Sequence, residues 1–188
     1  MATAQQKLKF KEAFDLIQGD QSNKVSEGLK ELEKFAEESV LEILVGIAAD
    51  TEHEDTKKQI LAFLSQVVDP ASRDLFIRYI KEEEFNMLRQ ALLTVVWNSR
   101  LDYSDYIADF VEIAVEGNFM EALECLTILE NLEGPFEEHH LLEAQLHLRE
   151  YVQSDRAHEE DRKTNIVSEI ALFIQEQNDG IDADLMLD

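Results

Sequence analysis

The segment KQILAFL at residues 58–64 returns 31 residues later as RQALLTV at 89–95, and after a further 31 residues as MEALECL at 120–126. Each copy is an amphipathic helical pattern, and each follows another helical pattern within its own repeat. A fixed period of this size is typical of arrays of stacked helix pairs, in which every unit buries its apolar face on its neighbours. The spacing therefore predicts an all-α chain built from helical repeats.

The rest of the chain fits the same plan, because only two prolines and six glycines interrupt it and no alternating strand pattern persists. We expect about nine or ten helices in a single domain at 1–177. Ser26 is expected to cap the second helix, and Pro70 to occupy the first position of the helix that opens the second repeat.

The expected parts are an N-terminal capping helix pair at 1–38, three repeats at 39–133, a divergent C-terminal pair at 134–177, and an acidic tail at 178–188 that is mobile or loosely docked. The helices of the three repeats are expected at 40–49 and 55–68, at 71–83 and 85–99, and at 104–116 and 118–133. Those of the last pair are expected at 137–153 and 159–177.

The charge of the chain is strongly unbalanced, because 41 acidic residues stand against 17 basic ones and give −24 at pH 7. Residues 1–35 are neutral, so the remaining 153 residues carry the whole excess. No Lys or Arg falls between Arg100 and Arg149, where twelve acidic residues lie. Such a surface repels phosphate backbones and anionic lipid headgroups. We therefore expect neither nucleic acid nor a membrane among the direct partners.

Catalytic signatures such as a glycine-rich phosphate loop or HExxH are missing, and carboxylates are too abundant for any pair of them to indicate a site. The single cysteine, Cys125, lies among leucines and is predicted to be a small core residue. The N-terminus has no signal-peptide pattern, and no apolar run reaches membrane-spanning length. We therefore expect a cytoplasmic protein that is not an enzyme and holds no cofactor.

Two of the repeats share a basic residue that opens the second helix and an Ala and Leu spacing after it, in KKQILA at 57–62 and LRQAL at 88–92. This pattern resembles HEAT and armadillo repeats, and the resemblance covers residues 39–133 best. It implies a right-handed α-solenoid of stacked antiparallel helix pairs. In such proteins the second helices line a concave face, on which partners usually bind.

Laying the repeats over one another indicates which positions of the second helices face outward and would align in a ridge. Trp and Arg are the residue types that most often anchor interfaces. Trp97, the only tryptophan of the chain, occupies one of these outward positions. The alternative is that a neighbouring helix or the C-terminal tail covers it. The residues of the ridge that we predict to bind a partner are Leu93, Trp97, Arg100, Glu121, Glu124 and Ile128.

An acidic stripe follows the second repeat, with carboxylates at spacings of 3, 4, 3 and 4 that place them on one narrow helical face. Like charges at i+4 cost about 0.2–0.5 kcal/mol a pair, which a basic partner docked there would relieve. The alternative is a solvated outer face that keeps the protein soluble. The stripe consists of Asp102, Asp105, Asp109, Glu112 and Glu116.

His139, Glu143 and His147 are spaced four residues apart and could share one helical face, which is compatible with a metal ion. A transition-metal site usually needs another ligand and a supporting second shell. The position about one turn earlier is Phe136, which cannot coordinate a metal. We therefore interpret the three residues as a surface stripe and expect no metal site.

These observations favour a non-enzymatic scaffold or adaptor that presents the concave face of a short acidic repeat array to a protein partner. The negative charge points to a partner segment rich in Lys or Arg. Two alternatives stay open, namely a small-molecule-binding enzyme or lyase on a HEAT-like scaffold and an acidic mimic of nucleic acid. The oligomeric state also stays open.

Overall fold

The structure is a computed structural model, and it describes residues 4–19, 21–33, 38–154 and 161–185. All regular structure in these ranges is helical, as ten α-helices and two short 3-10 helices. The prediction of an all-α chain is therefore confirmed. The contacts divide the chain into two compact units, which we call unit 1 (Met1–Leu101) and unit 2 (Asp102–Asp188).

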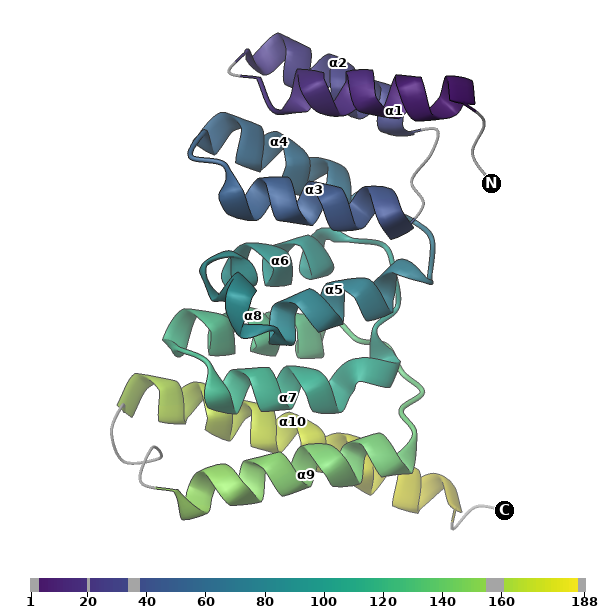
Figure 1. The fold of residues 1–188 in the computed structure, drawn as a ribbon. Helices are drawn as coiled ribbons and strands as arrows, with labels where there is room; N and C mark the ends of the chain where they lie inside the picture. The colour runs from purple at the N-terminus through teal and green to yellow at the C-terminus, as the bar shows by residue number, and fades with distance from the viewer. Residues whose placement is uncertain (1–3, 20, 34–37, 155–160, 186–188) are drawn as a thin grey trace. The chain divides into compact units, whose positions relative to one another are not determined.

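Unit 1 consists of three helix pairs in chain order (Figure 1). Its helices are α1 (Ala4–Ile17), α2 (Ser22–Leu32), α3 (Glu38–Asp50), α4 (Glu54–Leu64), α5 (Ser72–Lys81) and α6 (Asn86–Asn98), with the 3-10 helix η2 (Glu83–Phe85) before α6. The helices of each pair contact each other, α2 contacts α4, α4 contacts α6, and α3 contacts α5. The second helices α2, α4 and α6 thus form one row, and α3 and α5 belong to another.

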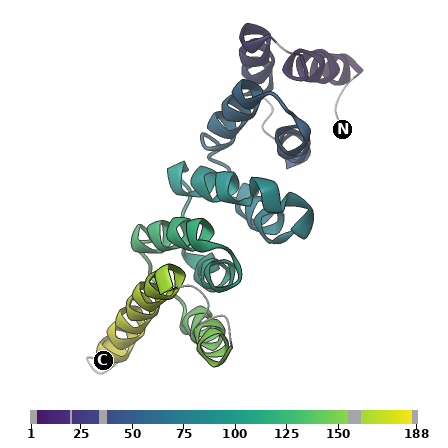
Figure 2. The same cartoon turned by 90° about the vertical axis from the view of Figure 1, so that its left-hand side faces the viewer.

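Unit 2 consists of the 3-10 helix η3 (Ser104–Tyr106) and the helices α7 (Ile107–Glu116), α8 (Phe119–Glu130), α9 (Glu138–Gln153) and α10 (Asp161–Leu185). The first helices α7 and α9 contact each other, and so do the second helices α8 and α10. Each also contacts its partner within the pair. Figure 2 shows the long helix α10, coloured yellow, from the side.

The repeated segments supply part of the core. Ile60 and Leu64 of α4, Leu92 of α6 and Ala122 of α8 are each 0% exposed. Full burial of a side chain the size of Leu or Ile stabilises the fold by about 1.5–3 kcal/mol relative to exposure. The predicted core position of Cys125 is confirmed, because its side chain is also completely buried.

Two predicted helix starts are wrong. Ser26 lies inside α2, which begins at Ser22 with Gln21 in the N-cap position. Pro70 lies before α5 rather than at its first position, because Asp69 forms the turn there. The Asp69 carboxylate accepts a hydrogen bond from the Ala71 amide at 3.0 Å, and the Asp69 carbonyl accepts one from the Ser72 hydroxyl at 2.6 Å.

The last helix extends further than predicted. α10 continues through Leu185, eight residues beyond the expected end at 177. Residues 178–185 of the expected tail are therefore helical, while 186–188 lie outside the described residues, as do 155–160 of the expected insertion. None of the helices in the described ranges combines the length and the apolar character needed to cross a lipid bilayer.

An ion pair connects the first helices of unit 1. Arg78 of α5 donates a hydrogen bond to the Glu42 carboxylate of α3 at 2.6 Å. This hydrogen bond raises the pKa of Arg78, and burial raises the pKa of the neighbouring Tyr79 hydroxyl. Both charged side chains reach solvent, so the ion pair contributes little to stability.

Candidate interaction surface

Three of the six predicted partner-binding side chains lie inside the protein. Leu93 is 0% exposed, Ile128 3% and Glu121 6%, so the prediction that these three face outward is wrong. The reason is that α6 and α8 bury side chains around more of their circumference than one apolar arc. Glu121 is buried at the start of α8, where its carboxylate accepts a hydrogen bond from the backbone N–H of Asn118 at 2.7 Å.

The other three residues reach the surface. Trp97 is 46% exposed, which does not fit the alternative in which a neighbouring helix covers it. Arg100 is exposed, and Glu124 is half-buried. Their role in binding a partner stays a prediction, which a Trp97→Ala variant can test.

A groove of about 370 Å³ lies between α4 and α6, the second helices of unit 1. It is lined by Leu61, Ala62, Ser65, Ala91, Thr94, Val95 and Asn98. None of these side chains is charged, so the groove offers apolar contact without charge complementarity to a basic partner.

Three of the five carboxylates of the acidic stripe lie on α7, whereas Asp105 lies in η3 and Asp102 before it, so the prediction that all five share one face of a single helix is wrong. On α7, Phe110, Val111 and Ala114 are each 0% exposed. Of the carboxylates, those of Asp102, Asp105 and Glu116 are exposed, and those of Asp109 and Glu112 are half-buried. Asp102 lies before α7 and has a structural task, because it accepts hydrogen bonds from the Ser104 amide at 2.9 Å and hydroxyl at 2.6 Å.

The neighbouring helix α9 adds further carboxylates to this surface. Residues 143, 147 and 150 recur at i, i+4 and i+7 and therefore lie on one side of α9. A small cleft of about 110 Å³ joins the C-terminal turns of α7 and α9, and it is lined by Val115, Glu116, His147, Glu150, Tyr151 and Ser154. We define the acidic face of unit 2 as Asp109, Glu112 and Glu116 of α7 together with Glu143, His147 and Glu150 of α9.

The excess of negative charge is concentrated in unit 2. Unit 1 contains 18 Asp and Glu and 13 Lys and Arg, whereas unit 2 contains 23 Asp and Glu and only four Lys and Arg. Among the described side chains of unit 2, fifteen carboxylates are exposed or half-buried, and the exposed cations are Arg149 and Arg162. The surface of unit 2 is therefore a region of negative potential.

The remaining described cation of unit 2, Lys163 of α10, points inward. It is 6% exposed. Its ammonium donates hydrogen bonds to the carbonyl oxygens of Val115 at 2.8 Å and Gly117 at 2.5 Å, at the C-terminal end of α7. It also lies 5.4 Å from the centre of the Tyr151 ring. Sequence reasoning did not identify this residue, although it lies on the buried stripe of α10.

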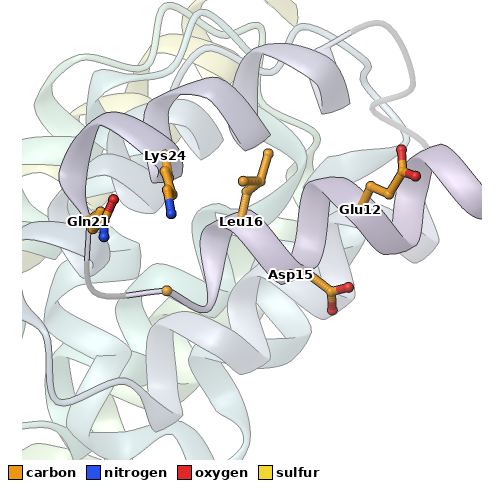
Figure 3. A pocket seen from close by; sticks show the side chains of 6 residues that line it. Glu12, Asp15, Leu16, Gln21 and Lys24 are labelled. Atoms are coloured by element: carbon orange, nitrogen blue, oxygen red, sulfur yellow. The ribbon is translucent and has the colours of Figure 1, made fainter.

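A cavity of about 470 Å³ lies between α1 and α2 and bears on the enzymatic alternative (Figure 3). Its ionisable lining residues are Glu12, Asp15 and Lys24. Figure 3 shows the carboxylate of Glu12 far from the amine of Lys24, and that of Asp15 directed away from both. A catalytic site needs polar groups that converge on one point, and these three groups do not.

The comparisons with known proteins match no family model, no curated protein and no solved structure to this chain.

Proposed function

We propose that this chain is a non-enzymatic interaction module of the HEAT-like repeat type, and that it binds a protein segment rich in Lys or Arg. The proposal rests on the surface of unit 2. Among its described side chains, fifteen carboxylates are exposed or half-buried, whereas only two cations are exposed. A partner of opposite charge relieves the repulsion between these carboxylates and is drawn to them over distances of about 10 Å at moderate ionic strength.

The acidic face is the proposed contact surface. It combines carboxylates from two helices that contact each other, and it contains the cleft between Glu116 and Glu150. A Lys or Arg side chain of the partner would place its charged end at this cleft, with its aliphatic stem against Val115 and Tyr151. The chain's own Lys163 does not place its ammonium at this cleft, because that ammonium donates hydrogen bonds to two carbonyl groups at the end of α7.

The test is a titration of the full chain with a fluorescent deca-lysine peptide, followed by anisotropy. A triple variant of the acidic face, Glu112→Gln, Glu116→Gln and Glu150→Gln, is expected to bind the peptide about tenfold more weakly. The reason is that three ion pairs at the surface, each worth about 0.2–1 kcal/mol, are lost. Added salt is expected to reduce the affinity of the unmodified chain steeply.

The matched control is a second triple variant of unit 2, Glu130→Gln, Glu133→Gln and Glu176→Gln, whose three side chains are exposed but lie outside the acidic face. It removes the same charge and is expected to change the affinity by less than about twofold, since distant exposed charges are screened. Equal weakening in both variants would show attraction to net charge alone and would contradict a defined site.

A further inference from the structure

The start of α9 gathers three side chains that are able to bind a metal ion. Glu137 occupies the N-cap position, and His139 and His140 lie in the first turn. The carboxylate oxygen and one nitrogen of each imidazole all lie within 4.8 Å of one another. The distance between His139 Nδ1 and Glu137 Oε2 is 3.2 Å, and the two imidazole rings lie 3.8 Å apart at their centres.

These distances suit a small tetrahedral ion. With metal–ligand bonds of 2.0–2.1 Å, the ligand atoms of tetrahedral Zn²⁺ are separated from each other by about 3.3 Å. The 3.2 Å between His139 Nδ1 and Glu137 Oε2 is the length of a hydrogen bond and is also close to this separation. Rotation of the His140 ring about its side-chain bonds can supply the third ligand. Three protein ligands leave the fourth position to water, as in open zinc sites.

The backbone that carries the three ligands is held in place. Phe136, directly before Glu137, packs its ring edge-to-face on Phe173 of α10, with the ring centres 6.2 Å apart. The Glu137 carbonyl accepts hydrogen bonds from the amides of His140 at 3.1 Å and Leu141 at 3.3 Å. Because the backbone is held in this way, less of its conformational entropy is lost when the ion binds.

The electrostatic balance at this position favours a cation. The N-terminus of α9 carries a partial positive charge, which opposes one. Against it stand the carboxylates of Glu137 itself and of the adjacent Glu138, within a unit that has 23 acidic and four basic residues. Two nitrogen donors and one carboxylate are typical of transition metals, whereas Ca²⁺ and Mg²⁺ prefer oxygen ligands.

We propose that Glu137, His139 and His140 form a three-ligand site for a divalent transition-metal ion of the Zn²⁺ type. This set differs from the i, i+4, i+8 set of His139, Glu143 and His147 that the sequence spacing suggests. Only His139 belongs to both sets, so the remaining residues of each set distinguish them.

The test is a titration of the full chain with Zn²⁺ in competition with a chromophoric chelator. We expect one Zn²⁺ ion to bind per chain. Each of the variants His139→Ala and His140→Ala is expected to lower the affinity for Zn²⁺ by more than about tenfold. Loss of a metal ligand is expected to cost at least as much as loss of an outer-shell partner, which lowers metal affinity by about 10–100-fold. A variant carrying Glu143→Gln and His147→Ala is the matched control and is expected to bind Zn²⁺ within about twofold of the unmodified chain.

A second measurement reports on the ligands directly. The chain contains five histidines, and Zn²⁺ is expected to shift the NMR ring signals of His139 and His140 while those of His53 and His147 stay in place. An excess of Ca²⁺ or Mg²⁺ should not reverse the shift. The proposal would be overturned if the chain did not bind Zn²⁺, or if the control variant lost as much Zn²⁺ affinity as the His139 and His140 variants. Ring signals that shift together at all histidines would also contradict it.

Discussion

Replacing Lys163 by methionine is expected to lower the free energy of unfolding of unit 2 by about 3 kcal/mol. The Lys163 ammonium is buried and donates hydrogen bonds to the carbonyl oxygens of Val115 and Gly117. Hydrogen bonds from a charged group are worth about 1.5–3 kcal/mol, and a buried carbonyl left without a donor costs about 1–3 kcal/mol.

Two opposing terms set the size of this effect. Methionine has a similar length and avoids the cost of burying a charge, which offsets part of the loss. The carbonyl groups at the end of α7 stay where they are, however, and they also lose the positive charge that balances the helix dipole. Removing one partner of a buried polar arrangement is destabilising even where replacing the whole arrangement is not.

The matched control for Lys163 is its neighbour Arg162, which is exposed. Arg162→Met removes one positive charge from the same turn of α10 and is expected to change the stability by less than about 0.5 kcal/mol. The only tryptophan, Trp97, lies in unit 1. Unfolding of unit 2 is therefore best followed by amide hydrogen exchange in α7 and α10. Equal losses in the two variants would mean that net charge, and not the two hydrogen bonds, determines the effect.

The position of Lys163 on the inside of α10 has a signal in the sequence, although its partners do not. Lys163, Val167, Ile170 and Ile174 recur at i, i+4, i+7 and i+11, which is the buried stripe of the helix. A lysine on that stripe indicates a buried charge that needs acceptors. The acceptors lie at the C-terminal end of α7, 46 and 48 residues earlier, and no local pattern connects positions so far apart.

The sequence predicts where most of the helices lie, but it does not predict which of their side chains are exposed. The 31-residue period places Ile60 and Leu64 in the core, because one apolar arc per helix is visible in the pattern. Leu93 and Ile128 lie off that arc and are nevertheless buried. A helix with neighbours on several sides buries more than one arc, and the number of its neighbours is a property of the tertiary structure.

The cluster of Glu137, His139 and His140 shows the same limit at the level of a site. Helical periodicity pairs His139 with residues four and eight positions later, because those share a helix face. Glu137 lies before the first turn of α9, where helical periodicity no longer applies. A cap residue can therefore approach side chains of the first turn that a regular helix would direct elsewhere.

Replacing Gly28 by alanine is expected to lower the free energy of unfolding of the α1–α2 pair by about 1–3 kcal/mol. Gly28 is buried in α2 where that helix packs on α1. A Cβ atom at this position would lie 2.6 Å from the Ala13 carbonyl oxygen and 2.8 Å from Ile17 Cγ1. The carbonyl is part of the α1 backbone, so the contact is relieved only by moving the two helices apart.

Helix propensity alone predicts the opposite sign, because alanine is favoured over glycine inside a helix by about 0.8–1 kcal/mol. Gly46 of α3 isolates that term, since a Cβ atom there would meet nothing within 4 Å. Gly46→Ala is therefore expected to raise the stability of unit 1 by about 0.5–1 kcal/mol. Amide exchange in α1 to α4 measures both variants. Changes of opposite sign show that close approach of α1 and α2 fixes the glycine at position 28, whereas a gain in stability in both would mean that the two helices separate without cost.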